Sequence, residues 1–343
     1  MMILFRADGN SQLGSGHIMR CLSLADALQE KGFCSTFVVA ELCMQSLVQK
    51  RGYECRVLGS TYDHMDEELP MFLQLLEERR PACVILDSYY VTSEYMTAVS
   101  SEFPLVYIDD LNMFDYPADL IINYMLYADK LDYSQNKNYL LGQQYALLRK
   151  EFQNVPRRRA SAQVNHVLLS TGGADWEHVA LQCVQYLRKQ PTDSMTYHVI
   201  LGAMNQDVAE IERLAGGCAN IVLHRTVTDM RSLMLQCDVA ISAGGTTLFE
   251  LCACGIPTVT YVLADNQIMN VEAFETEGLM LCAGDIRNDE RFVEHIFECL
   301  ETLVQDHSLR LHISEKMQEL VDGKGAARIA KAILERLIDA SET

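Results

Sequence analysis

The sequence of 343 residues lacks the features that would place it in a membrane or outside the cell. No stretch reaches about 18 uninterrupted apolar residues, which predicts that no segment spans a membrane. The first residues contain no basic segment followed by a long apolar run and a cleavage site. We therefore expect a cytoplasmic protein.

Paired cysteines and paired histidines are also missing. None of the twelve cysteines forms a C-x-x-C pair, and most lie in apolar segments, as Cys83, Cys237 and Cys282 do. This usage is typical of small core residues in a reducing cytosol. The nine histidines show no H-x-x-x-H spacing. The sequence therefore predicts no disulfide, no metal site and no bound cofactor.

Positive charge is scarce, because 28 Lys and Arg residues stand against 47 Asp and Glu residues, which gives a formal charge of −19. The first 150 residues share this bias, with 12 basic and 20 acidic side chains. Such a surface disfavours nucleic acids and anionic membranes as partners. A small anionic ligand is still compatible with it, because backbone amides and helix ends can bind anions locally.

What the sequence does contain is a strand–helix alternation that occurs twice. The length and the 49% of hydrophobic residues predict two globular domains. Short apolar runs that alternate with helical patterns predict a parallel sheet wrapped by helices in each of them. The predicted strands include 2–6, 34–39, 82–86, 105–108, 164–170, 196–201, 239–242 and 258–262.

The pattern is interrupted between residues 151 and 163, where the polar run Arg157-Arg158-Arg159 predicts a solvated linker. We place an N-terminal domain at residues 1–155 and a C-terminal domain at 163–343. Two similar domains joined by a linker predict a ligand-binding cleft between them.

Polar residues follow several predicted strands of the first half, namely Asp87, Asp109, Asp110 and Asn123. In parallel sheets, side chains just past the carboxyl ends of strands line the ligand-binding crevice. Each of the four has an alternative interpretation as a helix cap or turn residue.

Three predicted strand–turn–helix junctions carry glycine or other small residues, at 9–17, 171–175 and 242–247. The first N–H groups of a helix lack partners within the helix, so each junction can bind an anion. Three junctions in two domains favour a diphosphate ligand over coincidental turns. The residues expected to bind it are Gly14, Ser15, Gly16, Gly172, Gly173, Ala243, Gly244, Gly245 and Thr246. The first junction is not a dinucleotide-binding fingerprint, because Met19 occupies the third glycine position.

Several side chains near these junctions can act on such a ligand. His17 stands at the predicted start of helix 17–31, where it can exchange a proton beside a phosphate, or only pack in the turn. Glu250 lies one turn into the helix of the third junction, where its carboxylate can take both hydroxyls of a ribose, or only favour the helix start. Asn266 and Gln267 offer amides suited to sugar hydroxyls, or helix caps.

Five stretches together resemble a known family: 14–21 (GSGHIMRC), 107–110, 142–152, 170–175 and 241–267. The resemblance is to the UDP-2,4-diacetamido-2,4,6-trideoxy-β-L-altropyranose hydrolases of pseudaminic acid biosynthesis, and it covers roughly residues 1–285. These enzymes belong with the MurG-like glycosyltransferases. The resemblance implies a GT-B fold of two Rossmann-like domains. It also implies metal-independent hydrolysis of the anomeric C–O bond with inversion. We expect a monomer.

The resemblance also implies roles for individual residues. His17 is similar to the base that activates water, and Tyr89 to an active-site tyrosine, although its neighbours differ from the family pattern. Glu250 matches the ribose-binding acid. The shared motifs add Arg20 and Asp110 to the expected substrate-binding residues, and segment 224–227, with Val227, would lie beside uracil.

Other functions on the same scaffold remain open from the sequence. A glycosyltransferase would use an acceptor hydroxyl in place of water. A nucleotide-sugar binding module would bind without turnover, which the presence of His17 disfavours. A UDP-N-acetylhexosamine 2-epimerase would share the architecture but lacks the GSGHIMRC element.

Overall fold

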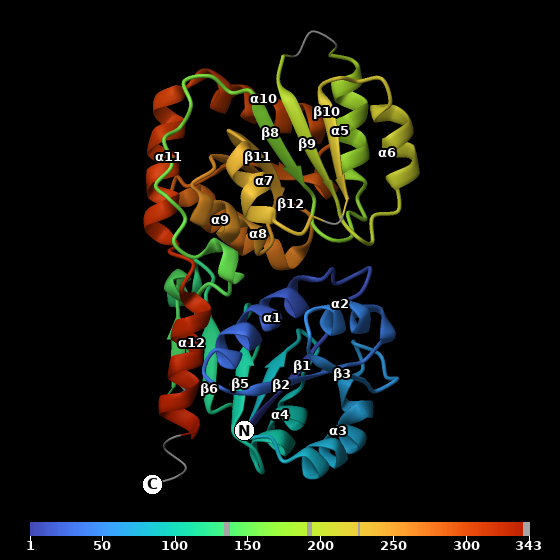
Figure 1. The fold of residues 1–343 in the computed structure, drawn as a ribbon, viewed down its shortest axis with the longest axis vertical. Coiled ribbons are helices and arrows are strands. Elements are labelled where there is room, and N and C mark those ends of the chain that lie inside the picture. Colours follow the sequence, from blue (N-terminus) through green and yellow to red (C-terminus); the bar gives the residue numbers. More distant parts are fainter. Residues whose placement is uncertain (134–137, 191–193, 226, 339–343) are drawn as a thin grey trace. The chain divides into compact units, whose positions relative to one another are not determined.

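The computed structural model describes residues 1–133, 138–190, 194–225 and 227–338, which form two compact units. The first unit comprises Met1–Lys150 and the chain from Lys324 onward, and the second comprises Glu151–Gly323. Each unit contains one parallel sheet with helices packed on it, as the alternating sequence pattern predicted (Figure 1).

The sheet of the first unit has the strand order β3-β2-β1-β4-β5-β6-β7. Its central strands are buried on both faces, which explains why they are almost continuous apolar runs. The strands are β1 (Met2–Ala7), β2 (Cys34–Val39), β3 (Glu54–Val57), β4 (Cys83–Asp87), β5 (Leu105–Ile108), β6 (Leu120–Asn123) and β7 (Tyr139–Leu141). The chain reverses its direction across the sheet between β1 and β4, and ligands bind outside the strand ends at such a switch point.

The helices of the first unit connect these strands. They are α1 (Gly16–Gln29), α2 (Gln45–Lys50), α3 (Met65–Arg79), α4 (Ser93–Ser100) and, from the end of the chain, α12 (Gly325–Ile333), which continues as a π-helical turn at Leu334–Ile338. Short 3₁₀ turns lie at Leu42–Met44, Ala128–Lys130 and Gln143–Tyr145.

Helix α12 lies in the first unit, whereas the sequence placed all of 163–343 in the second domain. It packs against α1 and the turn at Gln143–Tyr145 through small and apolar residues. Gly325 makes this approach possible, because a Cβ there would lie 2.2 Å from the carbonyl oxygen of Ala146. A steric fit between distant segments therefore decides to which unit the C-terminal helix belongs.

The sheet of the second unit has the order β10-β9-β8-β11-β12-β13, again with parallel pairing throughout the described residues. Its strands are β8 (His166–Ser170), β9 (Thr196–Leu201), β10 (Ile221–Arg225), β11 (Val239–Ala243), β12 (Thr258–Val262) and β13 (Leu281–Asp285). Its helices are α5 (Val179–Arg188), α6 (Val208–Ala215), α7 (Met230–Gln236), α8 (Thr247–Cys254), α9 (Ile268–Thr276), α10 (Phe292–Gln305) and α11 (His307–Leu320). Short 3₁₀ turns lie at Lys150–Phe152, Asp265–Gln267 and Ile286–Asn288.

The predicted linker packs on the second unit more closely than a solvated hinge would. Arg157 and Arg159 are exposed, as expected, but only 10% of the Arg158 side chain is exposed. Its guanidinium donates to the carbonyl of Cys237 and lies 3.8 Å from Asp238. The solvated interpretation is therefore wrong for Arg158, because a buried acceptor and a carboxylate attract it.

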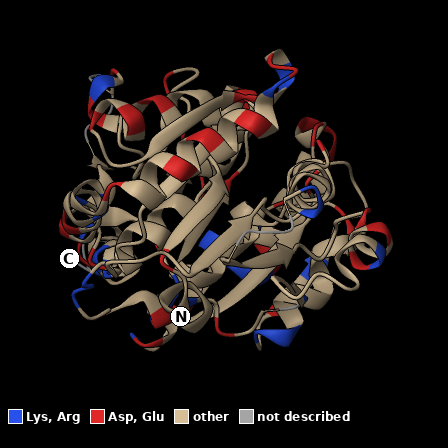
Figure 2. Cartoon of the chain, turned by 90° about the horizontal axis from the view of Figure 1, so that it is seen from above, with Lys and Arg blue, Asp and Glu red and all other residues tan. Residues whose placement is uncertain are grey.

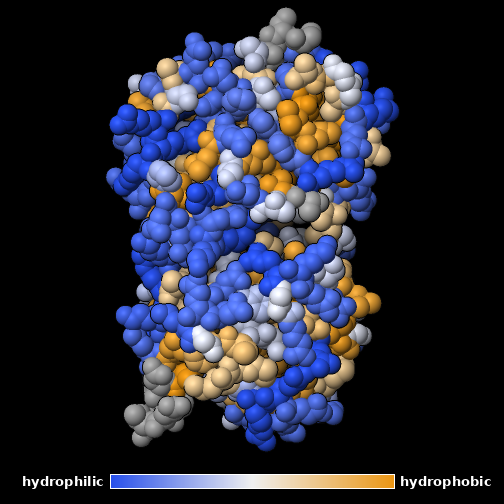
Figure 3. Space-filling model, in the orientation of Figure 1, coloured by the Kyte–Doolittle hydropathy of each residue, from blue (hydrophilic) through white to orange (hydrophobic). Residues whose placement is uncertain are grey.

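The surface reflects the composition. Figure 2 shows acidic residues spread over many helices and loops, with fewer basic residues among them. Figure 3 shows a mainly hydrophilic surface with separate apolar areas, one of them over β9 and β10, where Val222 is 37% exposed. Among the described residues, no helix is both long and apolar enough to cross a membrane.

Candidate active site

The loop between β1 and α1 is shaped by Asn10. Its Oδ1 accepts the backbone N–H groups of Gln12 and Leu13, both at 2.9 Å, and its carbonyl accepts the N–H of Gly14 at 2.8 Å. Gly14 has φ +74°, a left-handed conformation that favours glycine. The turn delivers the chain into α1, whose N-cap residue Ser15 makes no side-chain capping bond. The first N–H groups of α1 are thus not capped by that side chain.

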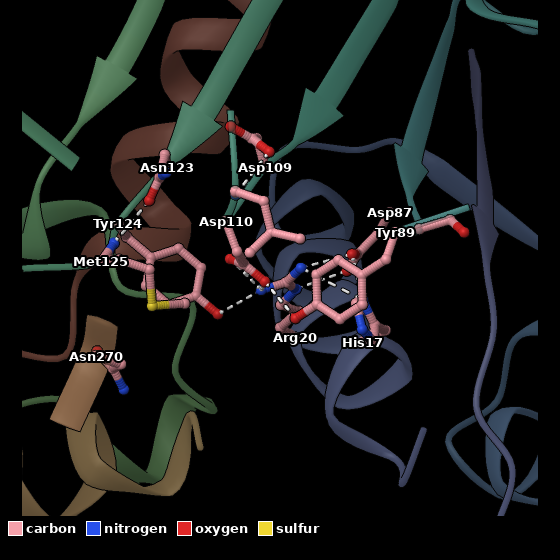
Figure 4. A network of polar contacts seen from close by, with 12 residues as sticks. His17, Arg20, Asp87, Tyr89, Asp109, Asp110, Asn123, Tyr124, Met125 and Asn270 are labelled. Carbon is pink, nitrogen blue, oxygen red and sulfur yellow. Dashed lines mark hydrogen bonds and ion pairs between the residues drawn. The ribbon is translucent and has the colours of Figure 1, made fainter. Parts of the chain in front are cut away.

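His17 is paired with Asp87 across the switch point of the sheet (Figure 4). The imidazole Nδ1 lies 2.5 Å from Asp87 Oδ1, and both side chains are buried, with the His17 side chain 8% exposed. An ionised carboxylate can only accept, so the proton of this hydrogen bond is on Nδ1. In a neutral imidazole Nε2 is then the acceptor, which is the form that can take a proton from a reacting group.

Arg20 lies one turn further along α1 and binds two carboxylates. Its Nε and Nη2 donate to the two oxygens of Asp87 at 2.6 Å, and its Nη1 donates to both oxygens of Asp110 at 2.9 Å. The guanidinium is only 3% exposed. Sequence analysis expected Arg20 and Asp110 to bind substrate. In the structure they bind each other, and through Asp87 they fix the position of His17.

Burial and charge act in opposite directions on this network. Burial by itself would raise the pKa of Asp87, but the charge of Arg20 and the hydrogen bonds from Arg20 and His17 outweigh it and hold that pKa below its ordinary value. Burial would likewise lower the pKa of Arg20, and the charges of Asp110 and Asp87 raise it instead. Asp87 is therefore ionised at neutral pH, as an orienting partner of His17 must be.

Two tyrosines complete the network. The Tyr89 hydroxyl donates to Asp110 Oδ2 at 2.7 Å, and its ring meets the His17 ring edge-to-face at a centroid distance of 4.5 Å. Tyr124 places its hydroxyl 3.3 Å from Arg20 Nη1, and its ring lies 5.8 Å from the guanidinium carbon. The structure thus brings Tyr89, which the family resemblance pointed to, into contact with His17.

The other two polar residues at strand ends shape turns. Asp109 accepts the N–H groups of Leu111 and Asn112 and the hydroxyl of Tyr116, and Asn123 Oδ1 accepts the N–H of Met125 at 3.0 Å. For Asp109 and Asn123 the alternative interpretation as turn residues is therefore correct, whereas Asp87 and Asp110 converge on Arg20.

The two junctions of the second unit follow neighbouring strands, because Ser170 of β8 pairs with Ser242 of β11. Gly172 has φ +85°, and Gly202 packs so closely on this turn that its Cβ would lie 2.3 Å from the Gly173 carbonyl oxygen. The loops at 171–175 and 242–247 thus both lie at the carboxyl edge of the sheet.

In the helix after the first of these loops, the first two N–H groups already have an acceptor, contrary to expectation. The sequence predicted a helix directly after the junction at 171–175, but α5 begins at Val179. The N–H groups of Val179 and Ala180 donate to the Asp175 carboxylate at 3.0 Å. Asp175 is 3% exposed, and burial raises its pKa to about 6. A carboxylate of the chain therefore occupies the position where an anion would bind.

The junction before α8 has no such side chain. The N-cap residue Thr246 makes no side-chain capping bond. Gly244 is held from both sides, because its N–H donates to Tyr261 and its carbonyl accepts Asn270 Nδ2, both at 2.9 Å. A Cβ at Gly244 would lie 2.3 Å from Val271 Cγ2, so only glycine fits here. The start of α8, beside Ala243 and Gly245, is thus a tightly packed glycine turn.

The other residues of the second unit that we expected to bind the ligand lie before and after this turn in the sequence. Glu250 is half-buried in the first turn of α8, and Asn266 is exposed in the turn after β12. Gln267 Oε1 accepts the N–H of Leu263 at 3.0 Å, which favours the loop-capping alternative for its side chain. Val227 is half-buried after β10, and part of the segment 224–227, namely residue 226, lies outside the described residues.

Sequence analysis did not identify Asp87 as the partner of His17, or Tyr124 as a support of Arg20. Asp87 was identified only as a polar residue at a strand end. The missing information was the strand order, since the pairing of β1 with β4 brings positions 17 and 87 together. No group of three His, Cys, Asp or Glu that could hold a metal ion is present within the described parts of the chain.

Comparisons with known proteins show to which family the chain belongs. The model of the glycosyltransferase family 28 C-terminal domain matches residues 143–333, more than half of the sequence. The chain belongs to this family. The match covers β8 to β13 and extends into α12, so it includes the glycine turn before α8 and Glu250.

Three curated relatives are similar over much of this chain. The Bacillus subtilis spore coat polysaccharide biosynthesis protein SpsG is 22% identical over 97% of both chains. The UDP-2,4-diacetamido-2,4,6-trideoxy-β-L-altropyranose hydrolase of Campylobacter jejuni is 23% identical over 73% of this chain and 87% of its own, which confirms the resemblance to that family. Protein MJ1062 of Methanocaldococcus jannaschii, described as uncharacterized, is 24% identical over 78% of this chain, which spans only 56% of that relative's length.

Among solved structures, MurG of Acinetobacter baumannii matches with a TM-score of 0.69 at 12% identity, over 98% of this chain and all of that one. This likeness, together with the two parallel sheets, confirms the GT-B fold.

Proposed function

We propose that this protein is a UDP-sugar hydrolase that cleaves the anomeric C–O bond and releases UDP and the free sugar. The observation that carries the proposal is the pair of His17 and Asp87, in which a buried carboxylate holds the Nδ1 proton and makes Nε2 the base. The matching glycosyltransferase domain and the Campylobacter relative supply the substrate class, a sugar linked to UDP.

In the proposed reaction, Nε2 of His17 takes a proton from a water molecule whose oxygen attacks the anomeric carbon. The bond between that carbon and the β-phosphate oxygen breaks, and the electron pair leaves with UDP. Attack from the face opposite to the leaving group inverts the anomeric configuration. The resulting imidazolium is stabilised by Asp87, as in other carboxylate–histidine pairs.

The leaving group needs its growing negative charge stabilised. The candidates for this task are backbone N–H groups at helix starts, those near Gly14–Gly16 before α1 in the first unit and those near Gly244–Thr246 before α8 in the second unit, because neither helix has a side-chain cap at its N-cap residue. Glu250 would hold the ribose hydroxyls, and Val227 would lie beside uracil. Asn266 would contact the sugar, and Gly172 and Gly173 would contribute through their turn rather than through α5.

The sugar of the Campylobacter relative, a 2,4-diacetamido-2,4,6-trideoxy-altropyranose, is our first candidate substrate, and pseudaminic acid biosynthesis for flagellin glycosylation is the corresponding pathway. The test is a panel of UDP-sugars incubated with the protein without any acceptor, with UDP and the sugar followed by ¹H and ³¹P NMR. We expect UDP release and an inverted anomer in the first spectra, and no release with His17→Asn. UDP release by that variant at the wild-type rate would refute the mechanism.

A second candidate is a glycosyltransferase, which is favoured by the family 28 match and by the spore coat polysaccharide relative. The same His17–Asp87 pair can deprotonate an acceptor hydroxyl instead of water. This candidate predicts that UDP release is negligible in the panel above until a sugar acceptor is added, so one experiment separates the two.

A further inference from the structure

A second aromatic pair lies beside the network of His17 and Tyr89. Tyr90 follows Tyr89 in the loop between β4 and α4, and its ring meets that of Tyr62 edge-to-face at a centroid distance of 5.3 Å. Tyr62 comes from the loop between β3 and α3, two strand positions beyond β1. The ring contact therefore joins the loops that follow β3 and β4, two strands that are three positions apart in the sheet.

Hydrogen bonds join the three loops that hold this pair. The Tyr62 hydroxyl donates to Gln12 Oε1 in the loop that leads to His17. Thr92, two residues after Tyr90, donates to Asp66 at the start of α3 at 2.7 Å. The N–H of Tyr90 donates to Ser88 Oγ at 3.1 Å, which fixes its backbone. The pair is thus preorganised, and a ligand that contacts it would not have to order the loops first.

Tyr90 differs from other tyrosines of the first unit in its exposure to solvent. It is 42% exposed, whereas Tyr95, Tyr107 and Tyr124 in the same unit are almost fully buried. The ring stays exposed in a loop at the carboxyl edge of a parallel sheet, and the same loop carries Tyr89, whose ring contacts His17. This edge is the region where ligands bind to such sheets.

The chemistry of this edge matches an N-acetylated pyranose. One face of a pyranose ring and the methyl group of an acetamido substituent are apolar and can pack on tyrosine rings. The hydroxyls and amides at the ring edge need donors and acceptors, and Gln12, whose Oε1 accepts Tyr62, carries two amide donors on Nε2. A polypeptide or lipid would need a longer apolar groove than two rings provide.

From these observations we infer that Tyr62, Tyr90 and Gln12 form the subsite for the sugar moiety and determine specificity for an N-acetylated pyranose. The inference rests on the proposed function, because it assumes that the sugar lies beside His17. These side chains bind the ring and do not exchange protons, so they should affect KM more than kcat.

The test uses Tyr90→Ala, Tyr62→Ala and, as a matched control, Tyr139→Ala, since Tyr139 is 47% exposed on β7 and outside the network. For the UDP-sugar hydrolysed fastest by the wild type, we expect each loop variant to raise KM on the order of three- to tenfold. We expect kcat to stay within twofold and inhibition by UDP to stay unchanged, because UDP lacks the sugar. Tyr139→Ala should match the wild type in all three constants.

The inference is overturned if both loop variants keep KM within twofold of the wild type. It is also overturned if UDP inhibition weakens in parallel with KM and the melting temperature falls, since that pattern indicates loop damage and not a lost sugar contact. Tyr62→Phe refines the result, because it keeps the ring and removes only the bond to Gln12.

Failure of the proposed function gives a different pattern. If the wild type releases no UDP, the affinities of UDP-N-acetylglucosamine and UDP can still be compared by calorimetry. The inference then holds only if the wild type binds the nucleotide sugar more tightly than UDP. The ratio of the two affinities must also fall at least threefold in Tyr90→Ala. Equal affinities of the wild type for the two ligands overturn it, and so does an affinity ratio that Tyr90→Ala leaves unchanged.

Discussion

Replacing Asp87 by Asn tests whether that carboxylate sets the protonation of His17. The variant keeps the shape of the side chain and removes its charge. In the wild type the two carboxylate oxygens accept four donors, two from Arg20, one from His17 Nδ1 and the weak donor Cys21 Sγ. An amide NH₂ must replace one of these oxygens, so at least one donor loses its acceptor.

If the NH₂ faces His17, the imidazole accepts at Nδ1 and carries its proton on Nε2, which cannot then act as a base. If it faces Arg20, the imidazolium loses the negative charge that stabilises it. The first outcome removes the base function and the second weakens it, and in a comparable Ser-His-Asp triad the same substitution lowers kcat by about 10⁴. We expect kcat for UDP release to fall by about 10²–10⁴ in Asp87→Asn, with UDP affinity unchanged.

Stability should fall as well. Charges about 4 Å apart attract by about 4 kcal/mol at an effective dielectric constant of 20, and removal of one partner of a buried pair costs about 3–5 kcal/mol. Arg20 retains both bonds to Asp110, so we expect a loss of about 2–3 kcal/mol in urea unfolding at pH 7. Because the folded pKa of Asp87 lies below its ordinary value, this contribution is present above about pH 4 and is lost as the pH falls further. The stability difference between wild type and variant should shrink accordingly.

Asp109→Asn is the matched control, since Asp109 is equally buried at the end of the neighbouring strand but bonds to Tyr116 and Tyr133 rather than to His17. It should lose stability and keep kcat. Asp87→Asn with kcat within threefold of the wild type, measured on folded protein, would refute the reasoning.

Three further predictions follow from the same structure. His17→Asn should lower kcat by about 10²–10⁴ with UDP binding retained. A parallel loss of UDP affinity would instead assign His17 to phosphate binding. Glu250→Ala should weaken UDP binding by about 1–3 kcal/mol. The affinity can be measured by calorimetry or by the fluorescence of the single tryptophan, Trp176. An unchanged affinity would mean that Glu250 only favours the helix start. Because burial raises the folded pKa of Asp175 to about 6, the wild type should lose up to about 3 kcal/mol of unfolding free energy as pH rises from about 4 to 6. Asp175→Asn should not show this loss, and identical pH profiles for the two proteins would contradict the assignment.

The sequence by itself determined the local architecture. The strands 34–39, 105–108, 196–201 and 258–262 were predicted with the bounds that the structure shows, because apolar runs between turn residues are a local signal. The same signal did not reveal α4 (Ser93–Ser100) or the short edge strands β7 and β13. Short edge strands carry little hydrophobic pattern and are strands only because a neighbour pairs with them.

Local sequence likewise located the glycine turns and His17, since a turn and a helix start depend on a few consecutive residues. It could not show which residue His17 would contact. The pairing with Asp87 joins positions 70 residues apart, and it depends on β1 and β4 being neighbours in the sheet. The contacts of Arg20 and the capping of α5 by Asp175 also required coordinates, because a charged side chain takes whichever partner the fold brings within reach.

The same limit applied to the end of the chain. The helical conformation of α12 depends on its own residues, but only its packing against α1 and the close approach of Gly325 to Ala146, after the turn at Gln143–Tyr145, assigned it to the first unit. Helix formation depends on neighbouring residues, whereas the surface on which a helix packs depends on the shape of residues far away in sequence. The sequence thus determined which elements form, and the tertiary structure decided which of their side chains meet.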